Sequence, residues 1–194
     1  GLIWLEATAV VEEGRTSSSQ LWLHDGTLDA FKALAERMHK LSNGTPLILQ
    51  LTHSGRFSRP HNLPAPVISY HNPLMNEKMR IDPDYPVVTD EYLDTLPEKF
   101  GYAAKLAREA GFDGVDIKCC HKYLFSELLS AYNRPGRYGG SLENRARLFL
   151  DSVAAASVWA NDDFILASRL GLYDCLPYPW GVGADHADYR KIDW

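Results

Sequence analysis

A short apolar strand predicted at residues 115–117 runs directly into three polar side chains, Lys118, His121 and Tyr123. Lysine and histidine can polarise a carbonyl group or bind an anion, and a tyrosine hydroxyl can deliver a proton. Packing alone explains a histidine and a tyrosine at the end of a strand equally well. The spacing therefore leaves both interpretations open, although this is the densest set of candidate catalytic groups in the chain.

Every predicted strand ends in a polar group. These groups are Glu6 and Thr8 at the end of the first strand, Gln50 at the end of the second, Lys118 at the end of the third and Arg169 at the end of the fourth. Because parallel strands share a direction, their carboxyl ends lie at one edge of the sheet, which is the catalytic edge in barrels. A polar residue at the end of a single strand merely marks the point where the strand leaves the buried core. Polar residues at the ends of all four strands favour a functional site at that edge.

The elements that must position these groups alternate in type. Apolar runs predict strands at residues 2–8, 46–51, 115–117 and 164–168. Helical periodicity predicts helices at residues 28–38, 95–110, 123–131 and 141–159, with Thr95 and Glu98 as a capping box and Ser141 as an N-cap. Residues 53–90 form a long, irregular, proline-rich connection. The order predicts a parallel α/β sheet, either doubly wound or a (β/α)8 barrel.

Composition narrows the class of protein. The 194 residues are 45% hydrophobic and 23% charged, which is ordinary for a globular protein. A net charge of −5 without a basic run argues against a nucleic-acid partner, and no apolar run is long enough to cross a bilayer. Three cysteines, two of them adjacent, make a poor disulfide framework, so we expect a cytoplasmic protein.

Several familiar motifs are absent from the sequence. No GxGxxG follows a strand, and the GRYGGS turn lacks the lysine of a phosphate-binding loop. Neither HExxH nor paired CxxC occurs, so we expect no metal site. The absence of GxSxG argues against a serine hydrolase.

Four blocks of sequence follow one another in a recognisable order. They are GLIWLEATAVVEEGR at residues 1–15, LILQLTHSGR at 47–56, AREAGFDGVDIKCCHKYL with SELLSAYNRPGRYGGSLENRARL within 107–148, and FILASRL at 164–170. Together they resemble the Old Yellow Enzyme family of FMN-dependent ene-reductases. The resemblance runs from residue 1 to about residue 171, and its most specific part is YGGSLENR.

The resemblance implies a (β/α)8 barrel with FMN at the carboxyl ends of the strands. Carried over by position, Ala7 would lie against the flavin and Gln50 would hydrogen-bond its pyrimidine edge. Arg169 would lie near the flavin N1–O2 region, where its positive charge would stabilise the anionic reduced flavin.

The resemblance also implies a reaction. Lys118 and His121 fall on the pair that binds the electron-withdrawing group of a small-molecule substrate, and Tyr123 falls on the usual proton donor. In the family, NADH or NADPH gives hydride to the flavin, and an activated alkene such as an enone then takes it at its β-carbon. The implied activity is that of an NAD(P)H-dependent flavin oxidoreductase.

Two features depart from the family pattern. Most members carry histidine where this chain has Lys118, and a lysine favours an acidic or carboxylated substrate or a subgroup that oxidises or demethylates amines. The chain is also short, because a complete barrel takes about 250 residues. We therefore expect residues 1–194 to form a single incomplete barrel domain covering the family's second to fifth strands, with residues 53–90 as a loop insertion.

Two alternatives to the ene-reductase remain open. One is an amine dehydrogenase or dienoyl reductase of the same superfamily. The other is a non-catalytic half-barrel that associates with itself, because four strands leave two sheet edges unpaired. For the same reason we expect the chain alone to bind FMN weakly, if at all.

Overall fold

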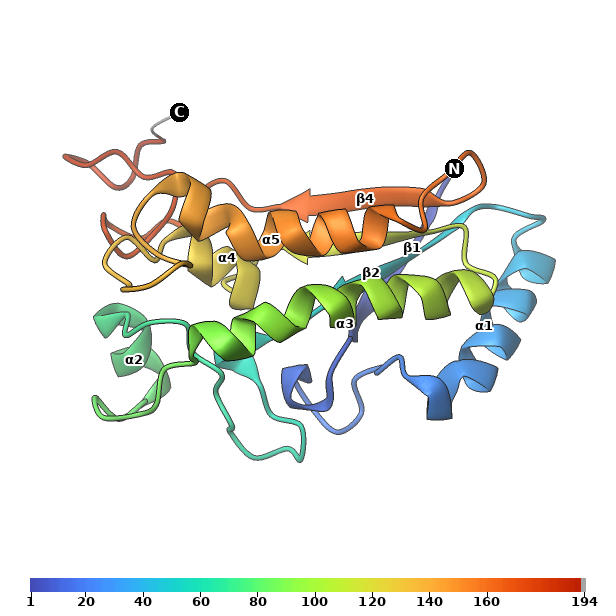
Figure 1. Ribbon diagram of the computed structural model, residues 1–194, viewed down its shortest axis with the longest axis horizontal. Helices are drawn as coiled ribbons and strands as arrows, with labels where there is room; N and C mark the ends of the chain where they lie inside the picture. The colour runs from blue at the N-terminus through green and yellow to red at the C-terminus, as the bar shows by residue number, and fades with distance from the viewer. Residues whose placement is uncertain (193–194) are drawn as a thin grey trace.

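A parallel four-stranded sheet organises the molecule (Figure 1). The structure is a computed structural model that describes residues 1–192. Its strands are β1 (Ile3–Ala9), β2 (Leu47–Thr52), β3 (Gly114–Cys119) and β4 (Ile165–Leu170), and they lie side by side in that order. Each strand therefore pairs with its neighbours in the chain, as in consecutive βα units of a barrel. The fold class predicted from sequence, a partial (β/α)8 barrel, is confirmed.

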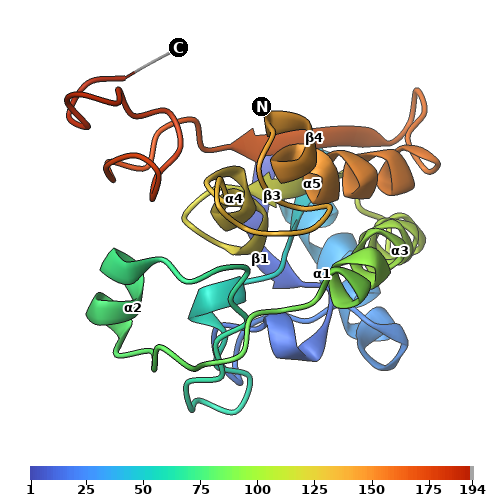
Figure 2. The same ribbon diagram turned by 60° about the vertical axis from the view of Figure 1, so that its left-hand side comes forward.

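Three long helices cover one face of this sheet. They are α1 (Leu28–Leu41), α3 (Asp90–Glu109) and α5 (Leu142–Ser157). Two short helices, α2 (Pro73–Met79) and α4 (Leu124–Leu129), lie beyond the carboxyl ends of the strands, and α4 lies nearer the sheet than α2 (Figure 2). Single 3-10 turns occur at Glu12–Gly14, Asp25–Thr27 and Gly55–Phe57.

The core lies between the sheet and these helices. Alternate strand residues point to it, and they are fully buried: Leu47, Leu49, Leu51, Val115 and Ile117. Opposite them lie aromatic and aliphatic residues of the helices, among them Phe31, Phe100 and Leu148. Because the side chains of a strand alternate between faces, the remaining residues of each strand point away from the helices.

Polar residues fix where the helices begin. The Ser141 hydroxyl accepts a hydrogen bond from the Asn144 N–H, so its predicted role as N-cap of α5 is confirmed. The capping box proposed at Thr95 and Glu98 is wrong. Helix α3 begins five residues earlier, capped by Thr89, and the Thr95 hydroxyl donates to the Tyr92 carbonyl inside the helix at 2.7 Å.

The connection at residues 53–90 is less irregular than its proline content predicted. It contains the 3-10 turn at 55–57 and helix α2, whose N-cap Asn72 accepts from the Met75 N–H. After β4, residues 171–192, which we call the tail, form neither helix nor strand apart from a bridge between Ala184 and Ile192, and residues 193–194 lie outside the described residues. Within residues 1–192, every helix is too short or too polar to cross a membrane.

Candidate functional site

The face of the sheet turned away from the helices carries the polar residues that the sequence singled out. In register across the strands, Gln50 lies beside Asp116, and Lys118 lies beside Arg169 nearer the carboxyl edge. A cavity of about 570 Å³ opens over this face, and its lining includes Trp4, Glu6, Gln50, Asp116 and Arg169. This cavity is the candidate active site.

Asp116 organises the cavity floor. Its carboxylate accepts hydrogen bonds from the Trp4 indole N–H at 2.9 Å and the Arg169 backbone N–H at 2.7 Å, and also from the Gln50 amide group. It is fully buried, so these bonds replace its hydration. Sequence analysis overlooked Asp116, although a lone acidic residue inside an apolar strand was the available signal.

The residues present fit a flavin in this cavity. Gln50 is oriented by Asp116 through its amide nitrogen, which leaves the oxygen Oε1 as an acceptor. Arg169 lines the same cavity and makes no ion pair within residues 1–192. Ala7 lies outside the cavity lining, at a β-bulge of β1, and its carbonyl accepts a hydrogen bond from the Gln20 amide at 2.7 Å. The donor set therefore suits a polar heterocycle that acquires negative charge.

Lys118 is buried at the carboxyl end of β3. It is 5% exposed, and its Nζ lies 4.3 Å from the centre of the Tyr123 ring in a cation–π contact. Burial lowers the pKa of Lys118, and the nearby Arg169 guanidinium lowers it further, while the Cys120 thiol and the Asp116 carboxylate oppose the shift. Within residues 1–192 no side chain accepts a hydrogen bond from Nζ.

His121 and Tyr123 occupy the turn that follows β3. Their rings lie 6.3 Å apart and are nearly perpendicular, and Phe57 packs on the other side of Tyr123 at 5.8 Å. Burial lowers the pKa of His121, helped by Lys118 and Arg169, and burial raises the pKa of Tyr123. At neutral pH the turn therefore presents a neutral imidazole and a protonated phenol.

We call Lys118, His121 and Tyr123 the edge triad. Their three polar groups share the end of β3, and none of them hydrogen-bonds to another part of residues 1–192. Lys118 is buried and Tyr123 is half-buried, whereas His121 is exposed. Buried donors without protein partners are available to a ligand, because burial limits their access to water. The triad suits an electron-withdrawing oxygen that must be bound and a carbon that must be protonated.

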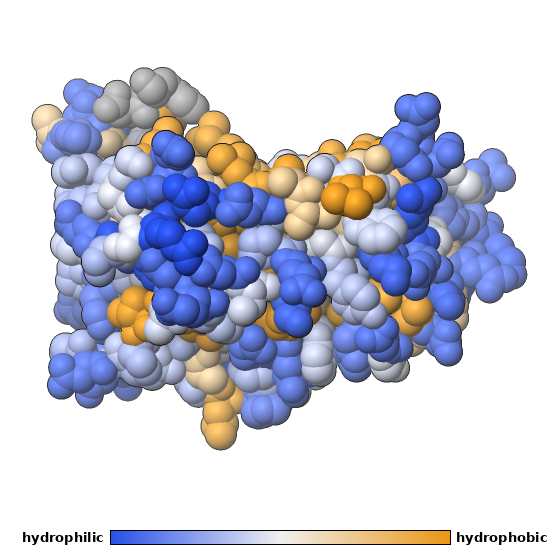
Figure 3. All heavy atoms as spheres, viewed as in Figure 1, coloured by the Kyte–Doolittle hydropathy of each residue, from blue (hydrophilic) through white to orange (hydrophobic). Residues whose placement is uncertain are grey.

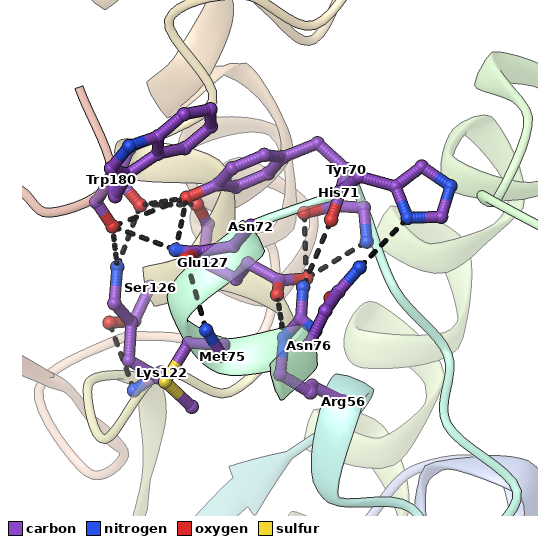
Figure 4. A network of polar contacts seen from close by, with 12 residues as sticks. Arg56, Tyr70, His71, Asn72, Met75, Asn76, Lys122, Ser126, Glu127 and Trp180 are labelled. Carbon is purple, nitrogen blue, oxygen red and sulfur yellow. Dashed lines mark hydrogen bonds and ion pairs between the residues drawn. The ribbon is translucent and has the colours of Figure 1, made fainter. Parts of the chain in front are cut away.

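A second polar group, overlooked in the sequence, lies fully buried behind the turn (Figure 4). Arg56 forms an ion pair with Glu127 and donates to the Asn76 side chain and to the Tyr70 carbonyl. The other oxygen of Glu127 accepts from the N–H and the hydroxyl of Ser69, both at 2.8 Å. This Arg56–Glu127 cluster ties the long connection 53–90 to α4.

The segment 134–145, which ends in the run YGGSLENR, holds the fold together through two arginines, Arg134 before the run and Arg145 at its end. Arg134 donates to the Ser69 and Val88 carbonyls at 2.9 and 3.0 Å and pairs with Asp90 at 2.6 Å. Arg145 donates to the carbonyls of Leu129 and Gly140. The run YGGSLENR therefore identifies the family through its scaffold, since the reactive groups lie elsewhere.

His53, in the His-x-Gly-Arg segment after β2, is also structural. Its Nδ1 accepts from the Gly55 N–H at 3.0 Å, which places the ring proton on Nε2, 2.8 Å from the Tyr92 hydroxyl. Tyr92 in turn donates to Glu13 at 3.0 Å. Burial lowers the pKa of His53 to about 3, so the imidazole is neutral and its hydrogen bonds are satisfied.

Comparison with known proteins agrees with this geometry. The sequence profile of the NADH:flavin oxidoreductase / NADH oxidase family matches residues 1–189. The chain is 36% identical to an NADPH dehydrogenase of Halalkalibacterium halodurans, covering 87% of this chain and 48% of the relative. An NADPH dehydrogenase of Listeria monocytogenes is 34% identical over 99% of this chain and 58% of its own length.

A solved structure shows the same arrangement. Old Yellow Enzyme from Pichia sp. AKU4542 superimposes with a TM-score of 0.75 at 28% identity, over 94% of this chain and 49% of that protein. The chain thus spans about half the length of the relatives it matches. FMN and NADH or NADPH are the cofactors that the family implies. The chain belongs to the NADH:flavin oxidoreductase / NADH oxidase family, which includes Old Yellow Enzyme.

Proposed function

We propose that this chain forms the flavin- and substrate-facing part of an FMN-dependent oxidoreductase that reduces activated alkenes such as enones. The supporting observation is the edge triad at the carboxyl edge of the sheet, whose three donors have no partner among residues 1–192. FMN, when bound, supplies hydride transfer from NADH or NADPH to the substrate. The chain spans only half of its relatives, so the proposal concerns the protein in which this segment acts.

The residues of the triad take different roles in this proposal. Lys118 and His121 bind the oxygen of the electron-withdrawing group, and they stabilise the negative charge that develops there during reduction. Tyr123 delivers a proton to the carbon next to that group. Its raised pKa keeps the phenol protonated at neutral pH, as this role requires. Gln50 and Arg169 orient the flavin and favour its negative charge.

NADPH oxidation by the protein, with FMN in excess and 2-cyclohexen-1-one as acceptor, tests this function. We expect consumption that depends on the enone and yields cyclohexanone. Oxidation of NADPH by oxygen alone, with no reduced enone formed, would contradict the proposal. NADH in place of NADPH measures which nicotinamide cofactor the protein prefers.

A second candidate substrate class is an acidic alkene, such as a 2-enoate. The observation that favours it is the charge of Lys118, which is buried and has no ion-pair partner within residues 1–192. A carboxylate neutralises an ammonium group, whereas an enone carbonyl does not. Reduction of cinnamate should therefore exceed reduction of cyclohexenone, and Lys118→His should reverse that order.

The same variant separates the remaining family chemistries. If Lys118 is a simple oxygen-binding donor, Lys118→His leaves enone reduction intact or improves it. Loss of the native reaction without any gain on enones would indicate amine dehydrogenation or another chemistry.

Self-association through the open sheet edges is tested independently by size-exclusion chromatography with light scattering, with and without FMN. In the space-filling view apolar side chains gather near β4, where Ile165 and Leu170 are exposed (Figure 3).

A further inference from the structure

Lys122 lies between two members of the edge triad but points away from them into the protein. Its ammonium group contacts three acceptors: Asp174 Oδ2 at 2.7 Å, Ser130 Oγ at 2.7 Å and the Trp180 carbonyl at 3.2 Å. Lysine has three N–H donors, so every donor is satisfied. Burial lowers the pKa of Lys122, and the Asp174 carboxylate opposes that shift.

The backbone of this turn needs external support. His121 has φ +64° and Lys122 has φ +57°, two successive left-handed residues without a glycine. Such conformations are unfavourable for side-chain-bearing residues and persist only where neighbouring contacts hold them. The Lys122 N–H bonds the Ser126 hydroxyl only weakly, at 3.3 Å, so the ammonium group supplies the strong contacts.

Two of the three acceptors of Lys122, Asp174 and the Trp180 carbonyl, belong to a segment distant in sequence. Asp174 and Val182 exchange two hydrogen bonds of 2.9 and 3.1 Å, which close residues 174–182 into a loop. The Trp180 carbonyl of that loop also accepts from the Asn72 amide at 2.9 Å, and its indole stacks on Tyr70 (Figure 4). The turn, the tail and the connection 53–90 therefore meet at Lys122.

The beginning of the tail rests on the same turn. The Gly171 N–H donates to the Cys119 carbonyl at 2.8 Å, and a β-carbon at Gly171 would lie 3.3 Å from the Cα and Cβ of Cys120. Cys120 is only 4% exposed. Displacing the tail would therefore uncover Cys120, whereas Cys119 points into the core beneath the helices.

We infer that Lys122 is a positioning residue, whose ion pair with Asp174 clamps residues 171–182 onto the turn and so fixes the placement of His121 and Tyr123. The functional consequence rests on the proposed function, whereas the clamp itself does not. The packing of residues 171–182 on the turn and the positions of His121 and Tyr123 therefore depend on the same buried ion pair. Breaking that pair should free residues 171–182 from the turn and make the positions of His121 and Tyr123 less defined.

Thiol labelling tests the clamp without any cofactor. One background keeps only Cys120 (Cys119→Ala, Cys175→Ser), and a companion keeps only Cys119 (Cys120→Ala, Cys175→Ser). Lys122→Gly removes the ammonium group while tolerating the left-handed backbone. We expect Lys122→Gly and Asp174→Asn each to raise the labelling rate of Cys120 by about tenfold through local opening, with Cys119 unchanged.

Two controls sharpen this test. Lys191→Gly removes an exposed tail lysine that lies 3.9 Å from Asp188, and it should leave both labelling rates unchanged. Lys122→Arg keeps the charge and should restore most of the protection of Cys120. An equal increase at Cys119 and Cys120 would show general destabilisation and overturn the inference, as would no increase at Cys120.

Steady-state kinetics of the protein supplemented with FMN test whether the Lys122–Asp174 ion pair matters for the proposed reaction. The clamp predicts that Asp174→Asn lowers kcat/KM for the alkene while kcat/KM for NADPH stays constant, because reduction of the flavin by NADPH needs no proton from Tyr123. An unchanged kcat/KM for the alkene together with exposed Cys120 would overturn the positioning role. If the wild-type protein reduces no alkene, the proposed function fails, and the labelling experiment still decides on the clamp.

Discussion

Two groups of polar residues meet at the turn after β3, one in the turn and one behind it, and they differ in how completely they are hydrogen-bonded. The Arg56–Glu127 cluster is fully buried, and each of its charged groups is paired within the protein. The edge triad lies at the carboxyl end of β3, where Lys118 is beside the cavity residue Arg169, and its donors have no partner within residues 1–192. The first arrangement can only hold the fold, whereas the second leaves donors free for a substrate.

The difference has an energetic basis. A buried charge is tolerated when its partner is present and becomes very unfavourable when the partner is removed. A donor that awaits a ligand gives up part of its solvation without compensation, so its removal costs the fold little. Mutations in the two groups should therefore separate stability from activity.

Glu127→Ala should produce the largest loss of stability. It leaves Arg56 buried without its carboxylate and should lower the free energy of unfolding by about 3–5 kcal/mol. Urea denaturation followed by circular dichroism measures the change. The control is Glu36→Ala, which breaks an exposed pair with Lys40 on α1 and should produce a change too small to resolve. Equal effects of the two variants would contradict the distinction.

Tyr123→Phe should have the largest effect on activity with almost none on stability. The hydroxyl makes no hydrogen bond within residues 1–192, so the free energy of unfolding should change by less than about 0.5 kcal/mol. Loss of the proton donor should slow reoxidation of the reduced protein by an enone by about 100-fold or more. Tyr102→Phe, which removes an exposed hydroxyl bonded to Asp25, serves as control. A normal rate in Tyr123→Phe would remove Tyr123 from the mechanism.

His53 should make stability depend on pH. Burial lowers its pKa to about 3 in the folded protein, against about 6.5 in the unfolded chain. Between these values only the unfolded state binds the proton, so stability falls as the pH decreases through this window. The decrease between pH 7 and pH 5 should be about 2 kcal/mol. His53→Gln should flatten this part of the stability profile, and an unchanged slope would show that other groups cause it.

Lys118→Met should not destabilise the protein. It replaces an unpaired buried ammonium with an apolar chain of similar length, so stability should stay constant or rise by up to about 1 kcal/mol. The same variant should no longer bind a saturated carboxylate such as hydrocinnamate, which calorimetry measures directly. A loss of several kcal/mol would place Lys118 with the structural cluster instead.

Local sequence signals predicted the elements of the fold well. Apolar runs placed all four strands to within about two residues, and Ser141 marked the start of α5, because burial and capping are properties of neighbouring residues. The polar ends of parallel strands likewise predicted which edge would carry Gln50, Lys118 and Arg169. Their assigned roles stay predictions until the variants are measured.

Partnerships across long sequence distances could not be predicted in this way. Arg56 and Glu127 are 71 residues apart, and Lys122 and Asp174 lie in different segments, so no periodicity links them. The left-handed conformation of His121 and Lys122 opposes local preference, since glycine or asparagine favours it. There the tertiary contacts override what the sequence alone would indicate.

FMN titration of the protein, followed by flavin fluorescence, tests the central assignment of the cavity most directly. Wild-type protein should bind FMN weakly but saturably, and Arg169→Met should weaken that binding by about tenfold, as expected for loss of one charge-assisted contact. Urea denaturation should show the same stability for both proteins. Equal FMN affinities of the wild type and the variant would contradict the placement of the flavin over the face of the sheet that is turned away from the helices.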